Sequence, residues 1–418
     1  MSQNLYMKKI GENAVSSLKQ ISNLNIKKKN STLKLFSYFL KKNLKLILKA
    51  NKLDLRKAKK NKSYDTNRLH LDEKKIYQII KSLKEIIKFK DPVGKTLASW
   101  KRPNGIVIKK VSIPLGVVGV IYESRPNVTA DVAALCFKTG NPVILRGGSE
   151  AYYSNKIISN LFRKALTKKK CNKNFVQLIK NKDRKHVDYL LSKMKQYVDI
   201  IVPRGGKNLV KKVQAISTVP TIGHLEGICH VYIDSDANID MSIKVVKNAK
   251  MRNFSICGAA ETLLIDRKCL KTHCNPILTE LSKAGCEIIG DKIIKKYFGN
   301  KIKIATENDW NTEYLSPKIS VKVVNGVKDA IDHINKYGTS HTDSIVTKNK
   351  KTAEKFLLGV KSAIAIHNAS TQFADGGEFG FGAEIGISTE RLHPRGPVGL
   401  DQLTTYKYIL YGKGQVRK

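Results

Sequence analysis

One local pattern recurs through the middle of the chain and restricts its fold: an apolar β-prone run, a turn and then a helix. The run Val117 to Tyr122 precedes a helical stretch at Thr129 to Lys138. Similar runs end in the glycine turns Arg146-Gly-Gly-Ser149 and Pro203-Arg-Gly-Gly206. Strands that alternate with helices predict a doubly wound parallel sheet, whose phosphate ligands bind near helix N-termini. Neither turn matches GxGxxG, so an ordinary β–α turn remains the alternative for each.

A second α/β unit begins after Glu226. The apolar residues of Ile239 to Met251 recur at helical spacing, which predicts a helix there. Further strands are expected at Cys229 to Ile233, Thr262 to Ile265, Ile319 to Val324 and Ala363 to Ile366, with helices at Val327 to Tyr337 and Lys350 to Leu358. The predicted fold class is therefore α/β, with two doubly wound domains.

The two ends of the chain follow other patterns. Apolar residues recur at helical spacing through about the first 100 residues, which predicts helices. Between Trp100 and Ser112, the turn Pro103-Asn-Gly105 separates two β-prone pieces and predicts a hairpin. Thr404 to Tyr411 has the composition of a late, exposed strand.

The chain carries a formal net charge of +43, from 77 basic and 34 acidic residues. Such a charge is found in nucleic-acid-binding proteins. Here the excess lies in scattered lysine runs that are not interleaved with aromatic residues, and no nucleic-acid-binding motif accompanies them. We interpret the runs as solvated helix faces and predict no nucleic-acid partner, although a positive field would attract phosphorylated anions.

Other features of the sequence bear on its compartment. No apolar run of 18 residues occurs, so no membrane span is predicted. The N-terminus lacks a secretion pattern, and the seven cysteines lack the regular spacing of a disulfide framework. We therefore predict a cytoplasmic location. Cys269, Cys274 and Cys286 show no CxxC spacing, and no metal site is predicted.

Cys257 lies in a loop of small residues between an expected helix and an expected strand. Such a junction would place the thiol at the mouth of the sheet, where backbone N–H groups could lower its pKa and bind an oxyanion. A reactive nucleophile is one interpretation. A small buried hydrophobic residue, the commonest role of a free cysteine, is the other.

Several longer segments go beyond a generic α/β pattern. They are Ser112 to Thr129, Phe137 to Asn141 with Arg146 to Ala151, Pro203 to Gly206, Cys257 to Thr262, Gly338 to Asp343 and His393 to Gly399. In this order, over about residues 70 to 418, they resemble the gamma-glutamyl phosphate reductase family of the aldehyde dehydrogenase superfamily.

The resemblance implies an aldehyde-dehydrogenase-like fold with two doubly wound α/β domains and a small β oligomerisation element. Residues 1–99 and 114–228 would form the cofactor-binding domain, and 229–367 the catalytic domain. Residues 100–113 and 391–418 would form the oligomerisation element, and 368–390 a return segment to the cofactor domain. A homo-oligomer is therefore expected.

The resemblance also implies a reaction: NADPH reduces L-glutamyl 5-phosphate to L-glutamate 5-semialdehyde and phosphate, the second step of proline synthesis from glutamate. Cys257 would attack the acyl phosphate, and hydride would reduce the resulting thioester. The Cys257 N–H and the Asn127 side chain would stabilise the oxyanion. Asn127 has a second interpretation, as a helix N-cap. Whether a glutamate 5-kinase hands over the acyl phosphate directly is left open.

The family motifs assign the remaining site residues. Those expected to bind NADP(H) are Arg146, Gly205, Gly206 and Glu313. Those expected to bind the substrate are Arg125, His341, Thr342, Arg395 and Gly396. Arg125 suits a phosphate or carboxylate because a guanidinium grips either with two parallel hydrogen bonds. His341 could equally be a structural histidine, and Glu313 a surface carboxylate.

One departure from the superfamily concerns the base of hydrolytic aldehyde dehydrogenases. The matching stretch here is His224-Leu-Glu226, and Glu226 does not fall on the position of that base. A phosphate-coupled reductase would lose its thioester to an activated water, so the departure favours this activity. The rival hypotheses are a superfamily member that oxidises free aldehydes, a basic nucleic-acid-binding protein and, third, an α/β protein with a purely structural role.

Overall fold

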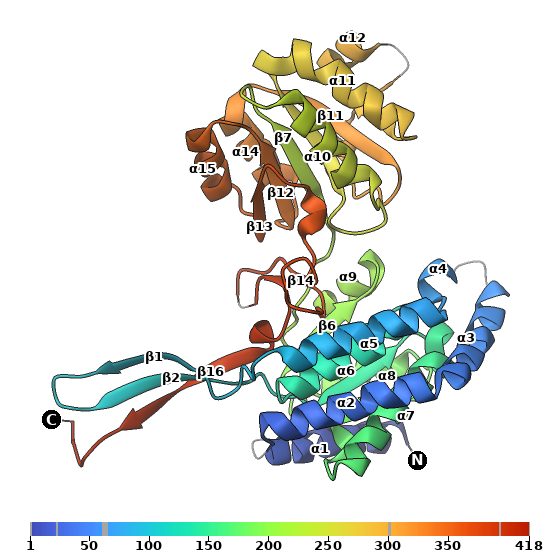
Figure 1. The fold of residues 1–418 in the computed structure, drawn as a ribbon, viewed down its shortest axis with the longest axis vertical. Coiled ribbons are helices and arrows are strands. Elements are labelled where there is room, and N and C mark those ends of the chain that lie inside the picture. Colours follow the sequence, from blue (N-terminus) through green and yellow to red (C-terminus); the bar gives the residue numbers. More distant parts are fainter. Residues whose placement is uncertain (1, 22–23, 61–65, 300–301, 393, 418) are drawn as a thin grey trace. The chain divides into compact units, whose positions relative to one another are not determined.

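The computed structural model describes residues 2–21, 24–60, 66–299, 302–392 and 394–417. Its chain divides into two compact units (Figure 1). Unit 1 comprises residues 1–223, 380–386 and 398–418, and unit 2 comprises 224–379 and 387–397. The units are described separately below.

Unit 1 contains a four-stranded parallel sheet. Its order is β5-β4-β3-β6, and its strands are Val176–Leu178, Val143–Gly147, Val118–Tyr122 and Ile200–Arg204. Side chains along β3 alternate between two apolar cores: Val118, Val120 and Tyr122 enter one, and Ile121 enters the other. Because successive side chains of a strand point to opposite faces, this alternation shows that both faces of the sheet are covered.

Two groups of helices cover these faces. The side chains of one group join the core with Val118 and Val120; these helices are α2 Ile26–Lys42, α3 Leu44–Lys59, α5 Glu73–Lys88, α6 Pro126–Lys138 and α7 Tyr152–Lys168. The other group joins the core with Ile121 and consists of α1 Gln3–Ile21, α8 Lys185–Lys193 and α9 Lys207–Ile216. The rings of Phe36 and Phe162 stack at 4.4 Å in the first core. A short helix, α4, spans Thr66–Leu69.

A three-stranded antiparallel sheet also belongs to unit 1. Its order is β1-β2-β16, with bounds Thr96–Lys101, Val107–Pro114 and Thr404–Tyr411. It forms a long ribbon that extends away from the helices of the unit (Figure 1). The turn between β1 and β2 closes through Gly105, whose φ of +84° suits a glycine. The predicted hairpin is confirmed, but its first strand begins at Thr96 rather than Trp100.

Unit 2 contains a seven-stranded parallel sheet in the order β10-β9-β11-β8-β7-β12-β13. In chain order the strands are β7 Cys229–Ile233, β8 Ala260–Asp266, β9 Glu287–Gly290, β10 Lys303–Ile304, β11 Lys318–Val324, β12 Thr342–Val346 and β13 Ile364–His367. Val231 and Leu263 pack toward α10 Ile239–Met251 and α11 Leu270–Lys283. Tyr232 and Leu264 pack on the opposite face toward α14 Gly326–Tyr337 and α15 Lys350–Gly359. Figure 1 shows the two helix pairs on different sides of the sheet.

Shorter elements complete unit 2. They are α12 Lys292–Phe298, α13 Glu307–Trp310 and the antiparallel pair β14 Ile387–Ser388 and β15 Gly396–Pro397. Both predicted doubly wound sheets are thus present. The sequence analysis missed β9, α11 and β12, and it placed the start of α6 at Thr129, three residues after its observed start at Pro126.

Two expectations about the whole chain are tested by the described residues. None of the helices there is both long and apolar enough to cross a bilayer. All seven cysteines are free thiols, as the lack of a regular spacing predicted.

Candidate active site

Three potentially reactive side chains lie at one edge of the sheet in unit 2. Cys257 lies in the loop before β8, and His341 directly precedes β12. His224 lies five residues before β7, the strand between these two. Neighbouring parallel strands share one edge at their amino ends, so the topology brings the three residues together. Their donor atoms all lie within 4.8 Å of one another.

The two imidazoles have distinct hydrogen-bond partners. Nδ1 of His224 lies 2.8 Å from the carbonyl oxygen of Ile387, which leaves Nε2 as the nitrogen able to face the thiol. Nδ1 of His341 lies 2.9 Å from the hydroxyl of Thr342. Among the residues that the structure describes, Nε2 of His341 is buried without a hydrogen-bond partner. The rings of His224 and His341 meet edge to face at 4.8 Å.

These imidazoles determine the electrostatics of Cys257. Burial by itself would raise the pKa of the Cys257 thiol, but the nearby His341 and His224 hold that pKa well below its usual value. The sequence predicted such a shift from backbone N–H groups, whereas the groups that lower the pKa of Cys257 in the structure are the two histidines. The loop follows the C-terminus of α10, where a helix dipole disfavours an anion, and the stabilisation comes from histidine side chains instead.

The backbone around Cys257 is tightly packed. A Cβ atom at Gly227 would lie 2.1 Å from the carbonyl oxygen of Cys257, so only glycine fits at that position. The Cys229 thiol donates a 3.1 Å hydrogen bond to the same oxygen. The side chain of Cys257 is half-buried against the apolar residues Ile364 and Ile387. The thiol of Cys257 is therefore held in one place while part of its surface stays open.

Glu313 lies in a loop between α13 and β11 and is half-buried rather than fully exposed. Its Oε1 accepts a 2.9 Å hydrogen bond from the N–H of Gly227. Burial raises the pKa of Glu313, partly offset by this hydrogen bond. Glu313, the expected ligand of the nicotinamide ribose, is thus linked through Gly227 to the loop that contains Cys257.

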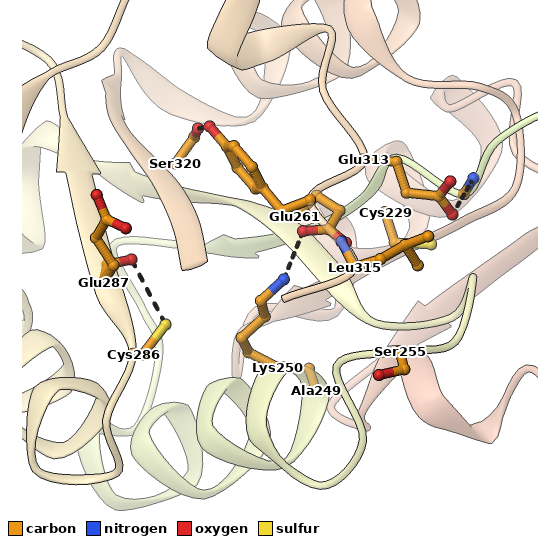
Figure 2. Close-up of polar contacts among 12 residues, drawn as sticks. Cys229, Ala249, Lys250, Ser255, Glu261, Cys286, Glu287, Glu313, Leu315 and Ser320 are labelled. Carbon is orange, nitrogen blue, oxygen red and sulfur yellow. Dashed lines mark hydrogen bonds and ion pairs between the residues drawn. The ribbon is translucent and has the colours of Figure 1, made fainter. Parts of the chain in front are cut away.

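Figure 2 shows a buried ion pair close to Glu313. Nζ of Lys250, in the last turn of α10, lies 2.5 Å from Oε2 of Glu261, the second residue of β8. Both side chains are fully buried. Burial raises the pKa of Glu261 to about 7, against the stabilising effect of Lys250.

The remaining expected substrate residues of unit 2 differ in exposure. Thr342 is fully buried, and its hydroxyl is engaged with His341. Arg395 is exposed and donates a hydrogen bond to the carbonyl of Lys361. Gly396 has a φ of +77° at the start of β15, a conformation that favours glycine. His393, which opens the family motif His393 to Gly399, lies outside the described residues.

In unit 1, Arg125 and Asn127 follow the carboxyl end of β3. Helix α6 begins at Pro126 with Arg125 as its N-cap, so Asn127 is inside the first turn and the N-cap interpretation of Asn127 is wrong. The Asn127 amide lies 3.3 Å from a carboxylate oxygen of Asp131. Ser124 has a φ of +41°, and its N–H and hydroxyl both bond to Glu150. This unusual conformation sets the direction in which the chain enters Arg125 and α6.

Two further parts of the same sheet edge carry the expected cofactor residues. Arg146, at the end of β4, donates a 3.0 Å hydrogen bond to the carbonyl of Lys182, and its Nε is buried without a partner among the described residues. Burial lowers the pKa of Arg146. At the start of α9, the N–H of Gly206 donates to a carboxylate oxygen of Glu123 at 2.9 Å. A Cβ atom at Gly205 would lie 2.5 Å from that carboxylate, so a side chain there would displace Glu123.

His224 is the main candidate site residue that the sequence did not predict. The family resemblance offered only one candidate in the stretch His224 to Glu226, the carboxylate of Glu226. The signal that could have found His224 is the strand order, because β8, β7 and β12 are neighbours. A cysteine and two histidines also form a donor set that zinc accepts. We assign this set to thiol activation and propose no resident metal.

Comparison with known proteins agrees with this geometry. Residues 3–288 match the family model described as "Aldehyde dehydrogenase family". A gamma-glutamyl phosphate reductase of Parvibaculum lavamentivorans is 49% identical over 416 residues, which cover 99% of this chain and 98% of the relative. The corresponding protein of Brucella suis biovar 1 is 48% identical, with 98% of each chain covered.

A solved structure extends the similarity to the fold. The crystal structure of gamma-glutamyl phosphate reductase from Thermotoga maritima matches with a TM-score of 0.95 and 40% identity, covering 99% of this chain and 100% of that chain. The fold, the cysteine–histidine site and the full-length similarity lead to one conclusion: the chain belongs to the aldehyde dehydrogenase family, within its gamma-glutamyl phosphate reductase branch.

Proposed function

We propose that the chain reduces L-glutamyl 5-phosphate to L-glutamate 5-semialdehyde and phosphate with NADPH, as the second step of proline synthesis from glutamate. The observation that carries this proposal is Cys257 beside two imidazoles, in a chain whose full length matches enzymes of this name. A thiolate stabilised by His224 and His341 is the form of cysteine that attacks a carbonyl carbon.

The first chemical step forms a bond from Cys257 Sγ to the acyl carbon and breaks the bond from that carbon to the phosphate oxygen. The departing phosphate needs one proton, which we assign to the imidazolium of His224 or His341. The product is a thioester on Cys257. After reduction of that thioester, the carbonyl re-forms and expels Cys257 as the thiolate, so no further proton is required.

Oxyanion stabilisation is assigned to the backbone N–H of Cys257 and, through the family resemblance, to the Asn127 side chain. Thr342 is assigned to orienting His341 because its hydroxyl contacts Nδ1 of that ring. Arg125 and Arg395 remain the proposed ligands of the substrate's anionic groups, since both carry guanidinium groups and lie in family motifs.

For the cofactor, the residues of unit 1 fit a dinucleotide in three respects. The buried Nε of Arg146 has no partner among the described residues, Gly205 has no side chain to keep a phosphate away from the backbone, and the N-terminus of α9 provides the positive end of a helix dipole. We propose that Arg146 contacts the adenosine ribose, Gly205 and Gly206 the pyrophosphate, and Glu313 the nicotinamide ribose. NADPH, when bound, supplies the hydride.

The test is the reverse reaction on purified protein, with glutamate semialdehyde, NADP and phosphate, followed by the absorbance of the reduced nicotinamide. Turnover that requires phosphate and prefers NADP over NAD supports the proposal. Turnover without phosphate that yields glutamate identifies an oxidase of free aldehydes and overturns it. Absence of turnover, combined with nucleic-acid binding that weakens steeply with salt, would favour the nucleic-acid hypothesis.

We also propose that the three-stranded sheet mediates a homo-oligomer. β1 is exposed along its whole length, and exposed aromatic side chains follow the sheet at Trp100, Tyr406, Tyr408 and Tyr411. Exposed apolar strands at a sheet edge pair with other chains. Light scattering after size-exclusion chromatography should show a smaller species for Trp100→Asp. The seven free thiols support a reducing compartment such as the cytoplasm.

A further inference from the structure

We propose that the buried Glu261 carboxylate is a positioning residue that holds the Cys257 loop and the Glu313 loop in register, with Lys250 as its charge partner. The inference rests on the proposed role of Glu313 as a cofactor ligand. Neither Lys250 nor Glu261 would contact the reacting atoms. Their effect would pass through the backbone that Glu261 holds.

The first observation is where the pair lies in the chain. Lys250 ends α10 and Glu261 begins β8, so the ion pair joins the two ends of the loop that contains Cys257 (Figure 2). The loop cannot widen at its base without separating two charges that are 2.5 Å apart and fully buried. Separation inside the protein would leave both charges without compensation, which is strongly unfavourable.

The second observation concerns the other oxygen of Glu261. Oε1 accepts a 3.3 Å hydrogen bond from the backbone N–H of Leu315, two residues after Glu313. Leu315 has a φ of +49°, an uncommon conformation for a residue with a branched side chain. Such a conformation persists when surrounding contacts determine it, and the hydrogen bond from Leu315 N–H to Glu261 is one of them.

The same loop is fixed beyond Glu313 by Tyr314. Its hydroxyl lies 2.7 Å from the hydroxyl of Ser320 and 3.0 Å from a carboxylate oxygen of Asp309. On the other side, Glu313 accepts from Gly227 N–H, and Gly227 packs directly on the Cys257 carbonyl. Glu261 therefore closes a continuous set of contacts that runs from the nucleophile loop through Gly227 and Glu313 to Leu315.

Energetics favour positioning over stabilisation as the role of the pair. A buried ion pair contributes little net stability, because the cost of desolvating two charges offsets their attraction. A variant with apolar residues of similar size at both positions would therefore be about as stable as the wild-type protein. What an apolar pair could not supply is the acceptor for Leu315 N–H.

The experiment compares two double variants that both lack buried charge. Lys250→Met/Glu261→Gln keeps a side-chain oxygen for Leu315 N–H, and Lys250→Met/Glu261→Leu removes it. NADPH affinity is measured by the fluorescence of the bound nicotinamide, and folding by thermal melting. We expect similar melting temperatures. The Kd for NADPH should rise about tenfold in the leucine variant, because a displaced Glu313 would lose its hydrogen bond to the cofactor. In the glutamine variant the Kd should rise less than about threefold.

A third comparison tests whether Glu261 acts through Glu313. Glu313→Ala should weaken NADPH binding by itself, and adding Lys250→Met/Glu261→Leu to it should cause no further loss. Equal Kd values for the two double variants would overturn the proposal, as would full additivity with Glu313→Ala. If the leucine variant does not fold, Lys250→Met/Glu261→Met takes its place.

Hydrogen exchange of the unaltered protein gives a test that needs no variant. The Leu315 amide must be protected if Glu261 holds it, and rapid exchange there would overturn the proposal. Failure of the proposed function has a different signature, because protein that binds NADPH but reduces no glutamyl phosphate would still show the difference between the double variants.

Discussion

The two parallel sheets of the molecule place their candidate functional residues at opposite ends of their strands. In unit 1, Arg125, Arg146 and Gly206 lie at or just beyond the carboxyl ends of β3, β4 and β6. In unit 2, Cys257 and His341 lie before the amino ends of β8 and β12. The same type of sheet therefore presents two different chemical environments.

The difference follows from the direction of the helices. At the carboxyl edge of unit 1, α6 and α9 begin, and the positive ends of their helix dipoles favour anions such as phosphates. At the amino edge of unit 2, α10 and α14 end, and their carbonyl groups disfavour an anion. A thiolate at that edge is stabilised by side chains instead, here those of His341 and His224. Phosphate binding can be supplied by backbone, whereas thiol activation here requires side chains.

The largest expected effect is at the amino edge. Cys257→Ser should fold normally and lose activity on the order of a thousandfold or more, because a serine hydroxyl beside imidazoles is hardly ionised at neutral pH. The reverse assay measures the loss, and thermal melting checks the fold. Substantial turnover by the purified variant would remove Cys257 from the mechanism. The amino edge of unit 2 would then no longer be the candidate site of thiol chemistry.

The second prediction tests the source of thiol activation. The reactive thiolate is lost as pH falls through the pKa of the thiol, so the depressed pKa of Cys257 keeps the wild-type protein reactive at low pH. His224→Gln with His341→Gln should move the pH midpoint of iodoacetamide alkylation upward, toward the value of a free thiol at about 8.5. The rate near neutral pH should fall about tenfold. Each single variant should show a pH midpoint and an alkylation rate between those of the wild-type protein and the double variant.

The exposed His70 provides the matched control for this experiment. His70→Gln should leave the alkylation profile unchanged, since no contact joins that histidine to Cys257 among the described residues. An unchanged midpoint in the double variant would show that the backbone, not the histidines, stabilises the thiolate.

The third prediction concerns the carboxyl edge of unit 1. Arg125→Lys keeps the charge but cannot form the two parallel hydrogen bonds of a guanidinium group, so we expect a loss of about 1–3 kcal/mol. It should appear as a higher KM for glutamate semialdehyde or phosphate, with little change for NADP. The exposed Arg102 of the hairpin turn gives the control Arg102→Lys. A weaker NADP affinity with unchanged substrate constants would assign Arg125 to the cofactor.

The smallest effect is expected at the N-terminus of α9, where the Glu123 carboxylate lies at the proposed pyrophosphate site. The Glu123 carboxylate accepts a hydrogen bond from the N–H of Gly206 at the start of α9. This side chain must move away if a pyrophosphate oxygen is to bind there. Glu123→Gln should therefore lower the Kd for NADP about two- to fivefold, the range for one charge at a helix N-terminus. Glu73→Gln, at the exposed start of α5, is the control. Weaker binding by the Glu123 variant would show that this carboxylate assists the cofactor instead.

Most of the fold could be predicted from the sequence because its strands are continuous apolar runs between helices. β12 could not, since Thr342-Asp-Ser-Ile-Val346 is half polar. The structure explains this: the buried Asp343 accepts 2.8 Å hydrogen bonds from the backbone N–H and the ring of His230 on the neighbouring strand. A strand stabilised by such a partner carries no local signal.

The site could be predicted only in part for the same reason. Cys257 is evident from its loop, and Arg125 and the glycine turns from their family motifs. The role of His224 depends on strand order, and that of Glu261 depends on a backbone N–H 54 residues later in the chain. Pairings between distant strands and loops cannot be inferred from periodicity, which reports only local structure.

The depressed pKa of Cys257 also determines how the protein responds to oxidants. Burial raises the pKa of each of the other six cysteines, so these thiols stay protonated and inert. Peroxide reacts with thiolates, and a half-buried thiolate with open surface is oxidised to a sulfenic acid first. The proposed nucleophile is therefore also the residue at which oxidative stress would stop the enzyme, reversibly at that first stage.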